Sequence, residues 1–167
     1  MRSRAVSTGG VALLEAALTL PLLVVLMLNL ANLGMYIYAW VTVNNAARVL
    51  LEYRVYNGVV LGFPSSPSTT QMGNLVAAEV SSLPNSASVT WVVCAPAKAN
   101  GTLDCQGTGT AFAPDADPSN PTRYALYSAK VWYTFQTLLA PVTLPMGYIA
   151  SALPGTVSRQ VSMRSMQ

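Results

Sequence analysis

The residues at the start of the sequence have the types and the spacing of a proteolytic cleavage site. Gly9 and Gly10 separate a short basic segment, which contains Arg2 and Arg4, from a long apolar run. An ordinary secretory signal is cut after its apolar core, whereas here the small residues precede that core. A cut after Gly10 therefore removes a basic leader, residues 1–10, and leaves the apolar run at the front of the new chain.

Two cysteines form the second pair of residues that could support chemistry. Cys94 and Cys105 lie beyond the apolar run, in a stretch rich in Ser, Thr, Gly and Asn. If this stretch is exported to an oxidising compartment we expect a disulfide, and otherwise we expect two reduced thiols. A zinc site is disfavoured, because two thiolates cannot complete a tetrahedral site and the sequence has no histidine.

Composition argues against catalysis, cofactor binding and nucleic-acid binding. The 167 residues are 52% hydrophobic and 9% charged, with six acidic residues and no histidine. There is no nucleophile elbow, phosphate-binding glycine loop or Cys-x-x-Cys motif, and the basic residues are not clustered among aromatic ones. Asp104, Asp115 and Asp117 indicate an acidic turn, because no calcium-loop template surrounds them. We therefore predict a protein that is not an enzyme and that holds no metal or cofactor.

A membrane-spanning helix is predicted over residues 11–43. Its core, Ala16–Met35, has no charged residue, and a helix of that length covers about 30 Å, enough for a bilayer. Pro21 should kink the helix without ending it, because neighbouring groups in a membrane protein satisfy the freed carbonyl. An aromatic belt marks the outer membrane interface. It consists of Tyr36, Tyr38 and Trp40.

The same helix is predicted to continue outside the membrane over residues 44–61. Apolar residues recur there at three- and four-residue spacing and predict one buried stripe. The stripe consists of Ala46, Val49, Tyr53 and Tyr56. Arg48 and Glu52 are spaced for an i, i+4 pair on a solvated face. The stripe requires a folded domain to pack against.

Residues 62–167 supply that domain. After a linker rich in Pro, Ser and Thr, a short helix is predicted over Leu75–Leu83. Three segments predict strands by their alternation, the first with one buried face. They are Ala87–Cys94, Arg123–Gln136 and Thr156–Arg164. A polar loop, 97–122, and a packed apolar connection, 138–153, join the strands. We predict an α+β fold in which the long N-terminal helix packs on a small antiparallel sheet of about three strands.

One face of the membrane helix carries polar residues at helical spacing. Asn29, Asn32 and Tyr36 stand at positions i, i+3 and i+7. Inside a bilayer such side chains suit hydrogen bonds to a neighbouring helix, worth about 0.6–2 kcal/mol each. The alternative is that the asparagines lie near the membrane interface and bind water.

The residues around the cleavage site resemble a known family. Gly10 followed by Glu15 is the pattern of type IV prepilins and pseudopilins. Val-Ala-Leu-Leu-Glu-Ala-Ala-Leu-Thr-Leu-Pro-Leu-Leu, residues 11–23, resembles the opening of TadE-like minor pilins of tight-adherence (Flp) pilus systems. Asn45-Ala46-Ala47-Arg48 is similar to the family's step at the membrane exit. Where many members carry an acid near the outer end of the span, this chain has Asn32-Leu33-Gly34, so any role for an acid there does not carry over.

The resemblance implies a structural function in pilus assembly. A prepilin peptidase would cut between Gly10 and Val11, and Glu15 would act in assembly, where the new α-amine is a candidate partner for its carboxylate. The mature protein would cross the bacterial inner membrane once, with its C-terminal domain outside the cytoplasm. Its partners would be the lipid bilayer, other pilin and minor pilin subunits, and the inner-membrane assembly platform. The alternative is a single-pass anchor whose outer domain binds a ligand or scaffolds a secretion complex without polymerising.

Overall fold

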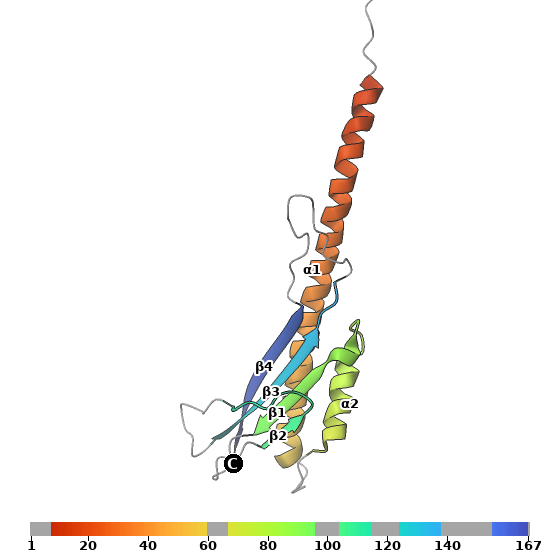
Figure 1. Cartoon of the computed structure of the whole chain (residues 1–167). Coiled ribbons are helices and arrows are strands. Elements are labelled where there is room, and N and C mark those ends of the chain that lie inside the picture. Colours follow the sequence, from red (N-terminus) through yellow and green to blue (C-terminus); the bar gives the residue numbers. More distant parts are fainter. Residues whose placement is uncertain (1–7, 60–66, 96–103, 115–123, 138–154, 167) are drawn as a thin grey trace, which may run out of the picture. The chain divides into compact units, whose positions relative to one another are not determined.

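The computed structural model describes residues 8–59, 67–95, 104–114, 124–137 and 155–166 (Figure 1). They fall into two compact units. Of the described residues, the first unit contains 8–35 and 137, and the second contains 36–59, 67–95, 104–114, 124–136 and 155–166. The predicted connection 138–153 lies outside the described residues, as do Asp115 and Asp117.

The second unit is built on a four-stranded antiparallel sheet (Figure 1). Its strands are β1 (Thr90–Ala95), β2 (Asp104–Gly107), β3 (Tyr124–Thr134) and β4 (Thr156–Met166), in the order β2-β1-β3-β4. The α+β class and the alternating patterns of β3 and β4 are confirmed. The strand count was too low, because the sequence pattern placed β2 in a polar loop. A strand of four residues has too few positions for a periodicity to be visible, and its pairing with β1 defines it.

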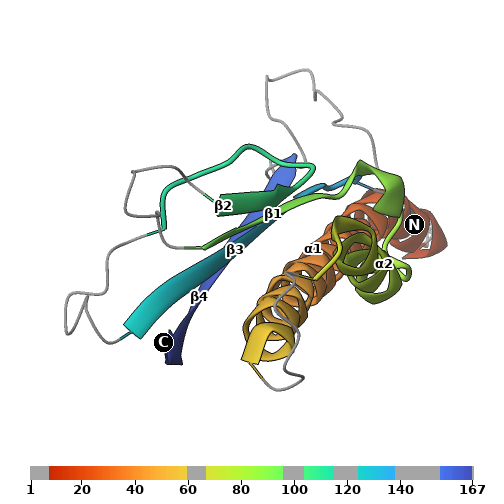
Figure 2. The same ribbon diagram turned by 90° about the horizontal axis from the view of Figure 1, so that it is seen from below.

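Two helices cover one face of this sheet (Figure 2). They are the C-terminal part of α1 (Thr8–Val59) and α2 (Thr69–Val80). The sheet contributes alternate residues to the core between the layers: Trp91, Val93, Ala129, Val131, Tyr133 and Val157. The Tyr133 hydroxyl donates a hydrogen bond to the carbonyl of Pro84. Burial raises the pKa of Tyr133 above its ordinary value.

The buried stripe of α1 differs from the predicted one. Tyr56 is 56% exposed, whereas Arg54 is only 6% exposed. The residues that α1 buries in this part of the helix are Ala39, Thr42, Val43, Ala46, Ala47, Leu50, Leu51, Arg54 and Val55. The prediction was right for Ala46 and wrong for Tyr56, because the predicted stripe was drawn from apolar residues alone and so left out Arg54. Arg54 is accommodated because its Nη2 lies 3.5 Å from the Asp104 carboxylate of β2, which supplies the compensating charge.

Helix α2 begins six residues before the predicted start at Leu75. Ser68 caps it, since its hydroxyl accepts from the N–H of Thr70 and the Gln71 side chain accepts from the N–H of Ser68. This reciprocal pair satisfies backbone donors that the first turn otherwise leaves unpaired. The signal was present in the sequence as Ser-x-x-Gln, within the stretch interpreted as a linker.

Gly73 in α2 offers a stabilising substitution. A Cβ built there lies 3.6 Å from the Trp91 ring, an ordinary van der Waals distance. Alanine is a better helix former than glycine, so Gly73→Ala should raise the free energy of unfolding by about 0.5–1 kcal/mol. Denaturant unfolding of the full chain in micelles, followed by tryptophan fluorescence, measures this. An unfolding midpoint below that of the native chain would contradict the expectation.

Strand β1 is buried on both faces, whereas the sequence predicted one buried face. Every residue from Trp91 to Ala95 is buried. The segment that follows β2 returns across the second face, where the N–H groups of Thr108 and Gly109 both donate to the carbonyl of Trp91. The prediction failed because this covering segment has no regular pattern of its own.

Candidate functional site

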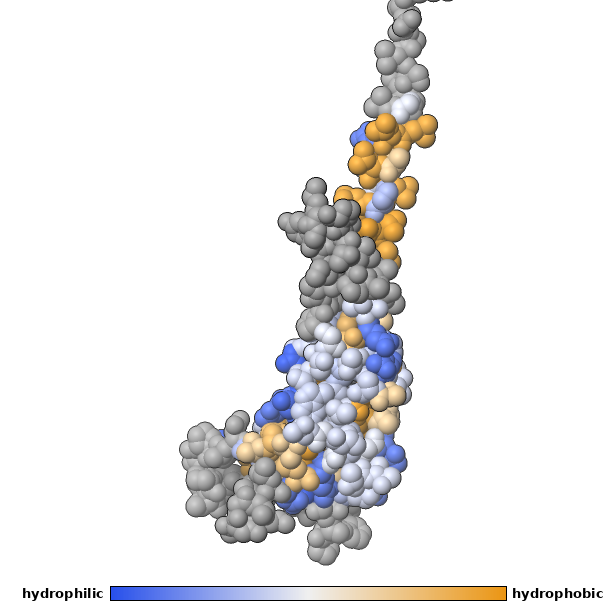
Figure 3. Space-filling view, in the orientation of Figure 1, coloured by the Kyte–Doolittle hydropathy of each residue, from blue (hydrophilic) through white to orange (hydrophobic). Residues whose placement is uncertain are grey.

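The N-terminal part of α1 is apolar and exposed over most of its surface. Every residue from Ala12 to Met27 is exposed, including Leu13, Leu18 and Leu22 at 70–75%. Orange, apolar side chains gather on this part of the helix in Figure 3. Within the described residues, one helix is long and apolar enough to cross a membrane, over Ala12–Tyr56. Burial in lipid would remove this surface from water.

Gly10 lies inside the helix, which begins at Thr8 and so includes the last residues of the predicted leader. Gly10 is exposed, and a Cβ built on it meets no atom within 4 Å. Among the described residues, no contact therefore requires glycine at this position. A requirement for a small residue has to come from another molecule, which is the condition a peptidase substrate site would meet.

Glu15 is exposed on α1, five residues after Gly10. Its backbone carbonyl accepts a hydrogen bond of 3.0 Å from the Thr19 hydroxyl. Its carboxylate forms no ion pair with any residue in the described ranges. A carboxylate in this apolar surface is unfavourable without a partner, so the geometry leaves it available to one.

Helix α1 continues through Pro21 without ending, and the kink at this position stays a prediction. Of the three polar residues expected on one helix face, Asn29 donates its amide to the carbonyl of Val25 at 2.8 Å. Asn32 is buried, at 1% exposure. The Tyr36 ring packs edge-on against Phe135, with 5.4 Å between centroids. Contact with a helix of another subunit remains a prediction.

The other two residues of the aromatic belt bind the sheet domain. The Tyr38 hydroxyl donates to Ser82 at 2.9 Å. The guanidinium of Arg159, on β4, lies 3.8 Å from the centre of the Trp40 ring, a cation–π contact. This contact explains how a charged residue shares the inner face of β4. The sequence did not predict that these aromatic residues attach α1 to the domain; their place at a membrane interface stays a prediction.

The structure joins Cys94 and Cys105 in a disulfide between β1 and β2. The two residues are direct cross-strand partners, with 4.0 Å between their Cα atoms. The Arg54–Asp104 pair lies one strand position away, so a covalent and an ionic link both hold β2. Arg54 and Asp104 were missed as a pair, because nothing in their spacing of 50 residues indicates contact.

Arg48 and Glu52 form the expected exposed pair at 3.1 Å. Across the ranges described, no group of three His, Cys, Asp or Glu side chains is placed to hold a metal.

The described residues thus define a small α+β domain attached to an exposed apolar helix. The family model described as TadE-like protein matches residues 10–49. The match begins at Gly10, covers most of α1 and includes none of the sheet, and it confirms the resemblance for this segment. No curated protein and no solved structure matches the chain.

Proposed function

We propose that this chain is a minor pilin-type component of a tight-adherence (Tad) pilus system. The observation that carries the proposal is the TadE-like match over residues 10–49. That segment contains a glycine without a packing role, an acid without an ion-pair partner in the described ranges and an apolar surface without protein cover. A helix of this kind serves both as a membrane anchor and as material for packing against other pilin helices.

In this proposal the protein is structural and not catalytic. Its helix crosses the inner membrane once, and its sheet domain faces the oxidising side, where the Cys94–Cys105 disulfide is stable. A prepilin peptidase removes the residues before Val11. The exposed apolar helix then contacts the lipid bilayer, other pilin or minor pilin subunits and the assembly platform.

Mapping the N-terminus of the protein purified from its native membrane tests the proposal. We expect the mature chain to begin at Val11. Gly10→Leu should fold and insert, since space around Gly10 is open, but should keep the preceding residues, because the peptidase has to seat a small residue. Intact-mass spectrometry separates the cleaved and uncleaved forms.

Gly34 provides the matched control, because it lies in the same helix and also has open space around a built Cβ. Gly34→Leu should be cleaved like the native chain. An intact N-terminus in the native protein would refute the processing step and favour a non-polymerising membrane anchor. Cleavage of Gly10→Leu at the same bond would refute the role given to Gly10.

A further inference from the structure

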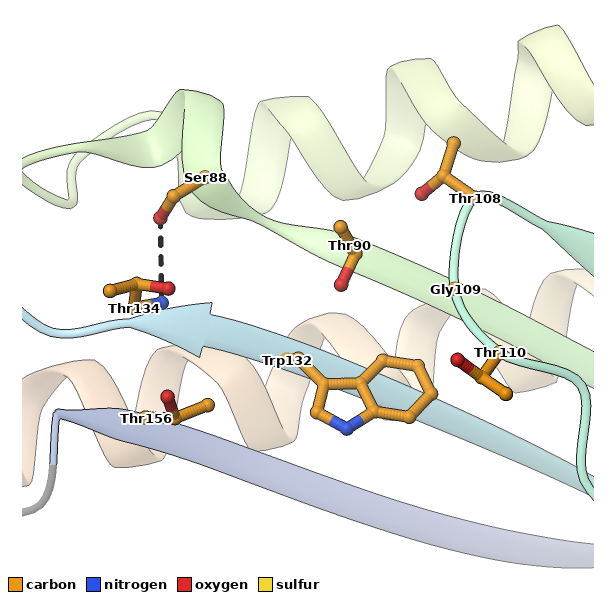
Figure 4. Close-up of a pocket in the computed structure, with 8 residues that line it drawn as sticks. All are labelled: Ser88, Thr90, Thr108, Gly109, Thr110, Trp132, Thr134 and Thr156. Atoms are coloured by element: carbon orange, nitrogen blue, oxygen red, sulfur yellow. Dashed lines mark hydrogen bonds between the residues drawn. The ribbon is translucent and has the colours of Figure 1, made fainter.

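A groove lies on the face of the sheet opposite the helices, and Trp132 of β3 lines it (Figure 4). Its volume is about 510 Å³, within the range of small-molecule sites. The other described residues of the lining are one glycine and six that carry hydroxyl groups. In the sheet, Trp132 pairs with Thr90 on β1 and Ser158 on β4. The groove is therefore centred on β3, an inner strand, and it extends to Thr156 on the edge strand β4.

The wall next to Trp132 is held in place by the backbone. Thr108 and Gly109 donate to the carbonyl of Trp91 at 2.8 and 2.9 Å. Gly109 lies so close to the indole that a built Cβ would be 2.4 Å from Cζ3 of Trp132. The Nζ of Lys130 lies 5.1 Å from the ring centroid. Gly109 thus closely approaches the edge of the indole, and Figure 4 shows the ring face-on to the viewer.

Hydrogen-bonding groups around the ring are available to a ligand. Within the part of the chain that the structure describes, four hydroxyls and the indole N–H form no hydrogen bond. The hydroxyls belong to Thr90, Thr110, Thr134 and Thr156. No charged side chain is among the described lining residues. The groove thus offers an aromatic surface bordered by neutral groups that both donate and accept hydrogen bonds.

We propose that this groove binds a neutral saccharide chain, with one sugar ring stacked on Trp132. A pyranose presents a C–H face, which packs on an aromatic ring, and a rim of hydroxyls, which donate and accept as threonine hydroxyls do. A shallow groove suits an extended polymer, because repeated weak contacts along a polymer add to its affinity. The proposal does not depend on the function proposed above.

Other ligands fit the groove less well. A peptide strand adds to a free sheet edge, whereas Trp132 lies on β3, which is paired with β1 on one side and β4 on the other. A phosphate or a carboxylate needs a cation, and the near ammonium of Lys130 is directed at the ring. An apolar ligand would leave the threonine hydroxyls without partners.

Saturation-transfer NMR on the full chain in lipid nanodiscs tests the proposal. Detergents with sugar headgroups are avoided, because they would compete for the groove. The probes are cellohexaose, maltohexaose and N-acetylchitohexaose, with polygalacturonate as the acidic counterpart. We expect at least one neutral probe to bind and Trp132→Ala to weaken that binding about tenfold or more. Trp132→Tyr, which keeps an aromatic ring, should stay within about threefold of the native affinity.

Two further variants separate binding from folding. Thr110→Val removes one free hydroxyl and leaves Trp132 unchanged, and it should weaken binding about three- to tenfold. Tyr56→Ala removes an aromatic residue that is 56% exposed on α1 and should leave binding unchanged. The proposal would be overturned if no neutral probe binds, if polygalacturonate alone binds, or if Trp132→Ala binds as tightly as the native chain.

Discussion

Replacing Glu15 with alanine is expected to abolish pili in a strain whose only copy carries the change, while the protein still inserts, folds and loses its leader. Glu15 is exposed and makes no ion pair within the described ranges. No contact that holds the fold is therefore lost with its carboxylate. Removal of a charge from the apolar surface favours insertion, by up to about 2.5–3.5 kcal/mol at the membrane centre.

The proposed processing would give the reason for the expected assembly defect. In the full chain, α1 begins at Thr8. A cut before Val11 would place a new α-amine four residues from Glu15, about 6 Å along the helix axis. The helix N-terminus would add a partial positive charge at the same end. In a stack of subunits, the carboxylate can neutralise the amine of a neighbour and so set its depth.

Electron-microscopic counts of pili, together with membrane fractionation, measure the effect. Glu15→Gln should behave like Glu15→Ala if the charge matters. Thr19→Ala is the matched control, because it removes only a hydroxyl bonded to the Glu15 backbone carbonyl, and pili should remain. Normal pilus numbers with Glu15→Ala would refute the assembly role, and loss of the variant from the membrane would show that Glu15 acts in insertion instead.

Gly107→Ala is expected to destabilise the sheet domain by about 3 kcal/mol or more. Gly107 has a φ of 143°, a conformation that residues with a side chain rarely adopt. A Cβ there would lie 2.2 Å from the carbonyl oxygen of Trp91 and 2.7 Å from the Cα of Val92. Both are backbone atoms of a central strand, so no side-chain rotation can relieve the collision. The same carbonyl accepts the hydrogen bonds that hold Thr108 and Gly109.

Thermal unfolding of the full chain in micelles should show a midpoint lowered by roughly 10 °C. Tryptophan fluorescence reports on this domain, because Trp40, Trp91 and Trp132 all belong to the second unit. Gly155→Ala is the matched control, since its Cβ meets nothing within 4 Å, and we expect a change within about 0.5 kcal/mol. Equal midpoints for the two variants would contradict the strain assigned to Gly107.

Local sequence patterns were sufficient to predict the long helix, two of the strands and the character of the N-terminal segment. The apolar run predicted the candidate membrane span of the long helix, because a helix without charges over that length is favoured in a bilayer. Alternation fixed β3 and β4, because successive side chains of a strand face opposite sides. The TadE-like resemblance could also be recognised from the sequence, since the residues that carry it lie almost entirely within one continuous segment, 10–49, that the family model matches.

Tertiary structure decided what depends on distant partners. Arg54 became a buried residue only because Asp104, 50 positions away, lies beside it. Strand β2 exists through its pairing with β1, and Trp132 became part of a groove because the segment after β2 is bound to the carbonyl of Trp91. The type of a residue indicates which secondary structure it favours. It does not indicate which charged group, backbone acceptor or chain segment will lie beside it after folding. These contacts therefore had to be seen in the folded chain.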